Sequence, residues 1–416
     1  MRRFVCMGLL CVLAGEVLAA DYRVGPEGYR DTLRHLLPGD RLRLEPGDYR
    51  QGLSLHQLSG QAGRPIVIEA ANPAEPPRFI ARPRANTVSL VDVRHLVLRH
   101  LELDGRNLPV DAVKAEGHSR YADFITLEHL SIHDHAASQQ NVAISTKCPA
   151  IGWVVRNNRI ERVGTGMYLG DSDGSDAFVG GVIEGNWIGR TLGYSLQIKH
   201  QLSRPVDSAD RQDTVIRYNV FSKQGALPGP LARPNVLLGH VPLAGAGSED
   251  RYLVYGNLFL HNPSEALLQA EGRVAVYDNV FINGYGDAIR IQPHNDVPRD
   301  MMIFSNTVLA SGTGIQVRRN EGAAYRQRLI ANVVAAAVPV QGGEAAHNVV
   351  MHYQPDWLEI AVPELSARLL GRSPGTPRIP ETLMRELATY PGWSGAPHPG
   401  APIIPAWLNT LDAGTP

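Results

Sequence analysis

A short apolar pattern recurs along the middle of the chain. Each copy has two or three strand-forming residues, then an asparagine, then more apolar residues. Six segments show it: "VVRNNRI", "VIEGNWI", "VIRYNVF", "LVYGNLF", "AVYDNVF" and "MIFSNTV", with Asn158, Asn186, Asn219, Asn257, Asn279 and Asn306. "LVLRHLEL" and "ITLEHLSI" fit the same frame with His100 and His129 at the asparagine position, and "LIANVV" and "AHNVV" fit as degenerate last turns. From His100 to Asn306 the copies lie 22 to 38 residues apart, which indicates a repeat protein.

A second family of short strands lies between these copies. Its members are "DAVKAEG", "NVAISTK", "GMYLGDS", "YSLQIKH", "NVLLGHV", "EALLQAE", "DAIRIQP" and "TGIQVRR". Two short strands in each repeat are typical of a parallel β-helix, in which one asparagine per coil stacks into an internal ladder at a tight bend. The alternative is a sandwich of hairpins. It would require Asn-Gly or Asp-Gly turns between alternating strands, and these are scarce here.

The two ends of the chain differ from the repeats. "YRDTLRHLL" predicts a short amphipathic helix that covers the open end of the apolar stack. After about Tyr353 the pattern stops, and "PELSARLLG" and "PETLMRELATY" predict short helices between prolines and glycines. We therefore expect a signal peptide at 1–20, a β-helix domain with its cap at 21–352 and a Pro-rich tail with short helices at 353–416.

The first twenty residues predict export. Arg2 and Arg3 precede a short apolar core, and small residues follow near Ala19 and Ala20, as in a cleaved secretory signal. A buried N-terminal helix is the alternative. No later segment is apolar enough to cross a membrane, so we expect a periplasmic or extracellular protein. Of the three cysteines only Cys148 would remain after cleavage, which excludes an internal disulfide.

Charge is nearly balanced, with 40 basic and 41 acidic residues, and gives no support to a nucleic-acid partner. Polar residues nevertheless collect on one face of the second strand family. Alternation places the following residues outward, coil by coil: Lys114, Glu116, Ser145, Lys147, Tyr168, Ser172, Gln197, Lys199, Gly239, Gln269, Glu271, Arg290, Gln292, Gln316 and Arg318. Eight coils at ~4.8 Å give a polar strip roughly 34 Å long. We expect an acidic polysaccharide to bind along it; an ordinary solvated sheet face is the alternative.

Three long loops follow the middle coils, and long insertions on one face of a solenoid usually shape the binding side. They bring further charged residues towards the strip. The candidate catalytic residues are Lys199, His240, Arg290 and His294. The candidate substrate-binding residues are Gln197, Gln201, Arg204, Arg233, Gln269, Glu271, Gln292 and Arg318.

Two segments carry a family resemblance. "LQIKHQ" followed by "TVIRYNVF" is similar to polysaccharide lyases of the alginate and dermatan (chondroitinase B-like) type, which are right-handed parallel β-helices. The resemblance implies that Lys199 is the base in β-elimination of a uronic acid, with Arg290 or a bound ion neutralising the carboxylate. Where those lyases carry an arginine before a histidine, this chain has Gly239 before His240. "QPHN", with His294, more weakly resembles a motif of mannuronan C5-epimerases, which share the proton-abstraction step.

Other chemistries remain as alternatives. "GDSDGSDAF" places Asp171, Asp173 and Asp176 at short spacing, as in a calcium site, although the same residues also form ordinary turns. Glycoside hydrolysis would need two carboxylates across one bond, and the strip offers only Glu116 and Glu271, far apart in the stack. The sequence thus favours an acidic-glycan lyase, with a non-catalytic glycan-binding or polysaccharide-export scaffold as the alternative from another class. It leaves the oligomeric state open.

Overall fold

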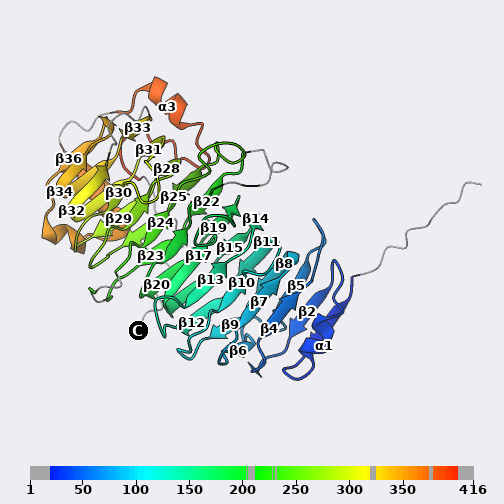
Figure 1. Cartoon of the computed structure of the whole chain (residues 1–416). Helices are drawn as coiled ribbons and strands as arrows, with labels where there is room; N and C mark the ends of the chain where they lie inside the picture. The colour runs from blue at the N-terminus through cyan, green and yellow to red at the C-terminus, as the bar shows by residue number, and fades with distance from the viewer. Residues whose placement is uncertain are drawn as a thin grey trace, which may run out of the picture.

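The computed structural model describes residues 19–202, 204, 211–226, 228–229, 232–318, 325–373 and 378–401. The predicted signal peptide lies almost wholly outside this part of the chain. Strands in three parallel ladders wind into an elongated solenoid (Figure 1). The all-β, right-handed parallel β-helix predicted from the sequence is confirmed.

The first ladder is a sheet in which every strand pairs with its counterpart on the next coil. Its strands are β1 (Asp21–Val24), β2 (Arg41–Leu44), β5 (Ile66–Ala70), β8 (Val93–Arg99), β11 (Ala122–Glu128), β15 (Val154–Arg156), β19 (Val182–Glu184), β22 (Thr214–Arg217), β25 (Tyr252–Tyr255), β28 (Val274–Tyr277), β31 (Met301–Phe304), β33 (Gln327–Ile330) and β35 (Glu344–Ala346). A small extra pair, β14 (Ala150–Ile151) with β18 (Phe178–Val179), lies just before two of these strands.

The second and third ladders join because two long strands, β32 (Thr307–Val317) and β34 (Val333–Gln341), run through both. The second ladder contains β3 (Asp48–Tyr49), β6 (Arg78–Ile80), β9 (Glu102–Asp104), β12 (Ser131–His135), β16 (Arg159–Val163), β20 (Trp187–Thr191), β23 (Val220–Ser222), β26 (Leu258–Leu260), β29 (Val280–Asn283) and β36 (Val349–Met351). The third contains β4 (Leu53–His56), β7 (Val88–Val91), β10 (Val113–Ala115), β13 (Val142–Thr146), β17 (Thr165–Leu169), β21 (Leu196–Ile198), β24 (Val236–Leu238), β27 (Leu268–Ala270) and β30 (Ile289–Ile291).

Strand alternation fills the interior with apolar side chains. In the third ladder one inward row is fully buried and runs Val113, Ile144, Met167, Leu196, Val236, Leu268, Ile289 and Ile315. A second inward row lies two residues later and includes Leu169, Ile198, Leu238, Ile291 and Val317. Because both rows face inward, the assignment of the polar residues to the outside still holds.

A ladder of buried asparagines runs along the inside of one bend, as predicted. The Asn158 amide donates to Asn186 Oδ1 at 2.9 Å, and the same bond repeats through Asn219, Asn257, Asn279, Asn306, Asn332 and Asn348. Each Oδ1 also accepts the backbone N–H of the asparagine one coil earlier, for example 3.0 Å from Asn158 N to Asn186 Oδ1. The ladder therefore satisfies backbone groups that the bend leaves without strand partners.

The predicted frame was one residue out for His100 and His129. Strand register pairs Leu127 with Val155, so His129 aligns with Asn157, and Leu130 takes the ladder position. His100, His129 and Asn157 have φ of 56°, 53° and 55°, in the left-handed region. The left-handed residue of this bend is thus the one before the ladder asparagine, and the ladder asparagines themselves do not need that conformation.

The N-terminal end is closed by α1 (Tyr29–Leu33), which is shorter than predicted. Tyr29 is fully buried and donates its hydroxyl hydrogen to the Gly52 carbonyl at 2.5 Å. The helix contributes Tyr29 and Leu33 to the end of the apolar stack.

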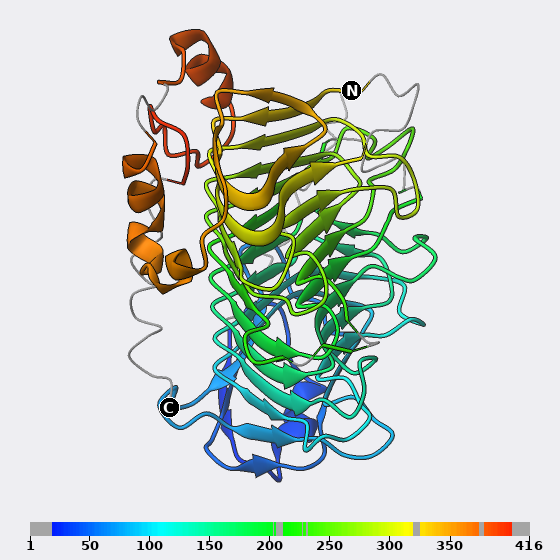
Figure 2. The same cartoon turned by 90° about the vertical axis from the view of Figure 1, so that its left-hand side faces the viewer.

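The chain after β36 folds back along the outside of the C-terminal coils (Figure 2). It contains the 3-10 helix η2 (Pro355–Glu359), α2 (Val362–Gly371) and α3 (Glu381–Leu387). Leu365 and Leu369 of α2 pack on the second ladder. Leu387, together with Tyr390 and Trp393, packs on the first ladder. The predicted tail is thus attached to the solenoid over 353–373 and 378–401. The final Pro-rich stretch lies mostly outside the described residues.

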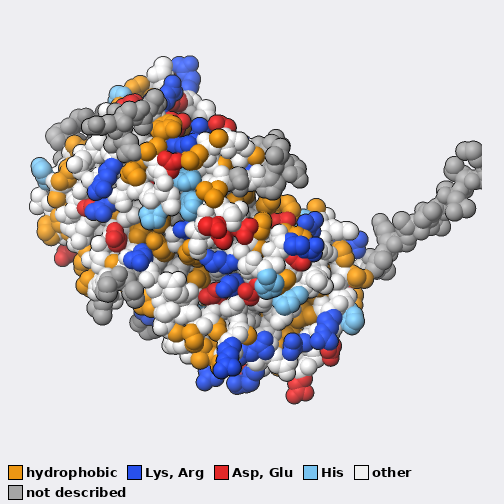
Figure 3. All heavy atoms as spheres, viewed as in Figure 1, with side chains coloured by type: hydrophobic (Ala, Val, Ile, Leu, Met, Phe, Trp, Pro, Cys, Tyr) orange, Lys and Arg blue, Asp and Glu red, His pale blue; other side chains and the backbone are white. Residues whose placement is uncertain are grey.

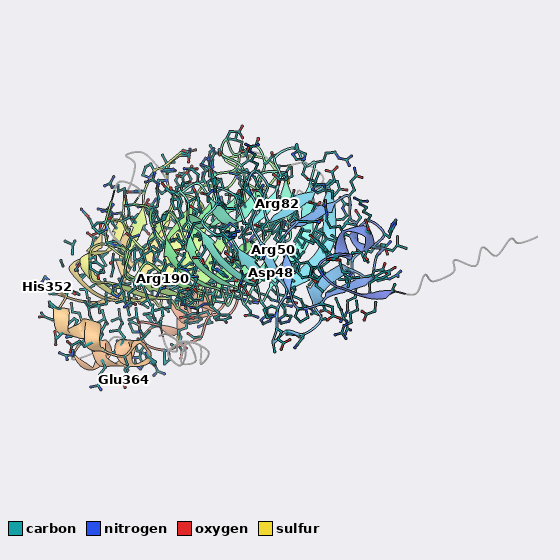
Figure 4. All side chains as sticks on the ribbon, turned by 90° about the horizontal axis from the view of Figure 1, so that it is seen from below. Asp48, Arg50, Arg82, Arg190, His352 and Glu364 are labelled. Atoms are coloured by element: carbon teal, nitrogen blue, oxygen red, sulfur yellow. The ribbon has the colours of Figure 1, made fainter. Side chains whose placement is uncertain are left out.

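These helices cover only the C-terminal part of the solenoid. Seen from below (Figure 4), α2 with Glu364 lies along that part, whereas Asp48 and Arg50 mark coils that it does not reach. The apolar clusters beneath the segment begin at β22 on the first ladder and at β20 on the second. Neither cluster includes the third ladder, so the outer face of that ladder is left for the long loops and for solvent.

Candidate functional site

The outer face of the third ladder carries two parallel rows of polar residues. Strand register defines the first row as Ser54, Ser89, Lys114, Ser145, Tyr168, Gln197, Leu237, Gln269, Arg290 and Gln316. The second row lies two residues later and runs Glu116, Lys147, Gly170, Lys199, Gly239, Glu271, Gln292 and Arg318. The predicted strip is therefore largely right, but Gly170 replaces Ser172, and Leu237 interrupts the polar row. Figure 3 shows basic, acidic and histidine side chains interspersed over the visible face of the solenoid.

Lys199 lies half-buried near the middle of the second row. Burial lowers its pKa, and the negative charges of Glu271 and Asp171 only partly oppose this shift. His200 follows it, with its ring centroid 5.3 Å from that of His240. The pKa of His200 is lowered by burial and by the charges of Lys199, His240 and His294. The structure therefore brings four of the predicted residues into one region: Lys199, His240, Glu271 and His294.

Glu271 and His240 form the buried floor of this region. The Glu271 side chain is 1% exposed, and His240 Nε2 lies 4.0 Å from its Oε1. The backbone N–H of Asn295 donates to the Glu271 carboxylate at 2.8 and 3.1 Å. Burial nevertheless raises the pKa of Glu271. His240 Nδ1 lies 2.9 Å from the Val241 carbonyl, which fixes the ring and directs Nε2 towards the carboxyl group.

Gly239 is required by the close approach of two coils. A Cβ at this position would lie 2.3 Å from the backbone nitrogen of His200 and 2.8 Å from the carbonyl carbon of Lys199. The packing of this chain therefore rules out the arginine that the resembling lyases carry at this position. No side chain fits at position 239 without a shift of the backbone beside Lys199.

A groove with a volume of about 530 Å³ lies beside this region. It is lined by Tyr194, Ala232, Arg233, Pro234, Leu237, Glu265, Gln269, Arg290, Gln292, His294 and Arg318. Five of the predicted substrate-binding or catalytic residues, three arginines and two glutamines, thus line one groove. His294 is exposed there and also acts on Glu271 and His200, so it connects the groove to the Lys199 region.

Arg290 does not join Lys199. Its guanidinium donates to Asp287 Oδ2 at 2.8 and 2.5 Å and lies 4.0 Å from Glu265. It belongs to the first outward row, three coils beyond the row position of Lys199. The sequence-based role of Arg290 as the partner of Lys199 is therefore not supported by the geometry, because a nearer carboxylate holds its charge.

Two more predicted substrate-binding residues have structural contacts. Arg204 and Asp250 form an ion pair whose side chains are 2% and 5% exposed, with N–O distances of 2.5 and 3.2 Å. Gln201 is buried and donates to the Phe178 carbonyl at 3.1 Å. Both hold the loops beside the site and do not reach the groove surface.

The remaining predicted residues differ in exposure. Gln269 donates to Glu265 at 3.0 Å and lies 3.4 Å from Gln292, so these side chains form a short chain on the groove floor. Gln197 is only 5% exposed. The Arg233 carbonyl accepts a bond from Lys223 Nζ at 2.6 Å, which fixes the groove wall that Arg233 lines. Lys223 is deeply buried, and burial lowers its pKa to about 7.

The predicted calcium residues form turns. Asp171 Oδ1 accepts the backbone N–H groups of Asp173 and Gly174 at 2.8 and 3.2 Å, and Asp173 Oδ1 accepts that of Ser175 at 2.9 Å. In the described part of the chain, the group of three acidic or histidine residues whose ligand atoms lie within 4.8 Å is instead Asp104, His133 and Asp134.

That second group is held by ion pairs and lies on the second ladder, away from Lys199. Asp134 receives Arg162 at 2.7 and 3.1 Å, and the two ring nitrogens of His133 lie 2.8 Å from Asp134 and 3.1 Å from Glu102. An imidazole with two carboxylates suits a divalent ion of intermediate hardness, but each would first have to release its present partner. The residues therefore fit a metal poorly in this arrangement.

Within the described residues, no helix has the length and apolarity needed to cross a membrane. Sequence reasoning overlooked His200 as a site residue and placed Lys147 only in the strip. His200 follows Lys199 directly, so its signal was present. The importance of Lys147 depends on which groups surround it in the folded chain, so the sequence carries no comparable signal for it.

No protein-family model matches the chain, and no curated protein matches it. Solved structures do match, and by fold they place the chain among parallel β-helix proteins. A structure of XylC with xylose shares 11% identity over 80% of this chain and 84% of its own, with a TM-score of 0.56. The GH136 lacto-N-biosidase from Eubacterium ramulus shares 14% identity over 80% and 68%, with a TM-score of 0.54.

A mutant of the PL6 family alginate lyase AlyGC shares 14% identity over 76% of this chain and 48% of its own, with a TM-score of 0.50. The chain thus spans about half of that lyase. The A-module of the mannuronan C-5 epimerase AlgE4 from Azotobacter vinelandii is also matched, at a TM-score of 0.41. The resemblance to alginate-type lyases is confirmed for the fold, and identities this low extend it no further.

Proposed function

We propose that the protein binds an acidic polysaccharide along the third ladder and cleaves it at a uronic acid by β-elimination. The observation that carries the proposal is Lys199, a half-buried lysine with a lowered pKa on the polar outer face of the third ladder. A lysine with a lowered pKa can be neutral often enough to accept a proton. The alginate-type lyases that resemble the chain in fold support this choice of reaction.

In the proposed step, Lys199 Nζ removes the proton on the carbon next to the uronate carboxyl group. The electron pair forms a double bond towards the neighbouring carbon, and the bond from that carbon to the glycosidic oxygen breaks. His294, exposed on the groove side, gives its proton to the leaving oxygen. His240 and Glu271 keep the floor rigid beneath the reacting sugar, since both are buried and hydrogen-bonded.

The test is a panel of acidic glycans, including alginate, polygalacturonate and dermatan sulfate, followed by the ultraviolet absorbance of the unsaturated product. Lys199→Ala should lower the rate by about 10² to 10⁴. Arg159→Ala is the control, because Arg159 is an exposed cation on the second ladder, outside the polar strip. Equal rates for wild type and Lys199→Ala would remove Lys199 from the mechanism.

A second candidate is a non-catalytic glycan-binding or export scaffold. Gly239 favours it, because the cation that the resembling lyases carry at this position cannot be accommodated, and Arg290 is held by Asp287. This candidate predicts binding without product across the whole panel. A C5-epimerase, which shares the first proton transfer, would instead exchange the C5 hydrogen with solvent and release no unsaturated product.

We also propose that the chain is exported, on the basis of its first twenty residues. Expression of the full chain with an epitope at its C-terminus, followed by fractionation, tests this. Retention of the tagged protein in the cytoplasm at full length would contradict it.

A further inference from the structure

Lys147 lies on the same outward row as Lys199, two coils earlier. The register of β13, β17 and β21 places Lys147, Gly170 and Lys199 at equivalent positions on three successive coils. Coils are ~4.8 Å apart, so the two backbones are separated by about twice that distance. Gly170 has no side chain, and a Cβ there would already lie 3.3 Å from the Cβ of Lys199. No side chain of this row therefore lies between the two lysines.

The Lys147 side chain leans towards Lys199. Its Nζ lies 3.5 Å from the centre of the Tyr168 ring, and Tyr168 belongs to the next coil in that direction. The ring is itself fixed, because Tyr168 Oη lies 3.1 Å from Ser172 Oγ. A cation above an aromatic face is held in place without an anionic partner, so its charge is still available to a ligand.

Charges around Lys147 come from several elements. The charges that act on it are Asp171, Lys114, Asp111 and Lys199, two acidic and two basic groups. Burial lowers the pKa of Lys147 to about 8. Lys147 thus remains mostly charged at neutral pH. The nearby acidic groups do not fully offset the cost of burying its charge, so an added carboxylate would stabilise the ammonium.

We propose that Lys147 binds the carboxylate of the sugar on which Lys199 acts, and so supplies the cation that is absent at Gly239. The proposal rests on the function proposed above and specifies its substrate as a free, unesterified uronate. The negative charge of Asp171 acts on both lysines and opposes the lowering of their pKa values, so it partly offsets the repulsion between the two ammonium groups in the absence of ligand.

The test compares acids with their esters. Alginate oligomers and their propylene glycol esters, and oligogalacturonates and their methyl esters, are titrated into the full chain carrying Lys199→Ala, so that no turnover occurs. Added Lys147→Met should weaken binding of the acid about tenfold and leave binding of the ester within about twofold. Lys147→Arg should restore the preference for the acid. Arg159→Met is the control, because Arg159 also lies over an aromatic ring, 4.4 Å from the centre of Trp187, but on the second ladder; it should change neither.

The preference for the acid should also fall as the pH rises through about 8, and Lys147→Met should show no such fall. Equal losses for acid and ester in Lys147→Met would indicate a purely structural role and overturn the inference. So would a protein with Lys147 intact that does not prefer either acid to its ester. If the preference depends on Lys147 while the wild type yields no unsaturated product, elimination fails and the carboxylate site stands.

Discussion

On two of the three outer faces of the solenoid the outward residues of the C-terminal coils are apolar, whereas on the third face they are polar. Over the C-terminal coils, the first ladder turns Leu253, Tyr255, Tyr277 and Phe304 outward, and the C-terminal segment covers them. The second ladder does the same with Val220, Leu258 and Leu309, beneath α2. The corresponding positions of the third ladder are Gln269, Arg290 and Gln316.

The same parallel strands thus carry either an apolar or a polar outer face, depending on whether another segment covers it. The described parts of the C-terminal segment, 353–373 and 378–401, cover two faces and leave the third, which is where Lys199 lies and the groove is found. The apolar exception on the open face, Leu237, is only 4% exposed and lines the groove. The open face is therefore a distinct surface, and three substitutions test this difference.

The largest effect is expected on a covered face. Leu369→Ala removes a fully buried side chain between α2 and the second ladder and should lower the free energy of unfolding by about 2–5 kcal/mol. Arg368→Ala, next to it but with 65% of its side chain exposed, should stay within about 0.5 kcal/mol. Urea titration measures both. Similar, small changes would mean that α2 contributes little to the solenoid.

A smaller effect, dependent on pH, is expected where the C-terminal segment contacts the first ladder. Asp278 Oδ2 accepts the backbone N–H of Ser394 at 2.9 Å, and burial raises the pKa of Asp278 to about 7. The unfolded carboxyl group loses its proton near pH ~3.9. Stability should therefore decline as the pH rises from about 4 to about 7, because the folded state must then bury a charge.

Asp278→Asn cannot ionise, so the midpoint of thermal unfolding should fall less between pH 5 and pH 8 than in the wild type. The full difference is at most about 4 kcal/mol, at ~1.4 kcal/mol for each pKa unit. Asp213→Asn, on the same ladder but partly exposed and paired with Arg211 and Arg251, is a useful contrast. A parallel pH profile for Asp278→Asn and wild type would show that Asp278 is ionised at no cost.

The smallest effect on stability is expected on the open face. Arg318 is exposed and lines the groove, so Arg318→Ala should change the free energy of unfolding by less than about 0.5 kcal/mol. Its affinity for an acidic glycan should nevertheless fall a few-fold, and the loss should shrink at high salt because exposed charges are screened. A salt-independent loss, or a large loss of stability, would blur the distinction between the open and covered faces.

The repeat made most of the fold predictable. An asparagine and short apolar strand segments recur in each coil and are local in sequence, so the β-helix and the asparagine ladder could be inferred before any contact was known. The polar strip followed from alternation alone. His100 and His129 were misplaced by one residue, because a histidine in the left-handed position and an asparagine beside it look alike in an unaligned repeat.

The partners of the charged residues could not be read in the same way. The sequence by itself determined that Lys199, His240, Glu271 and His294 would lie on one face near the middle of the solenoid. Only the tertiary structure decided that Arg204 is buried with Asp250, that Arg290 is held by Asp287, and that Lys147 leans towards Lys199 across Gly170. The reason is physical: strand period fixes which way a side chain faces, whereas a long side chain chooses among neighbours that loops bring from other coils.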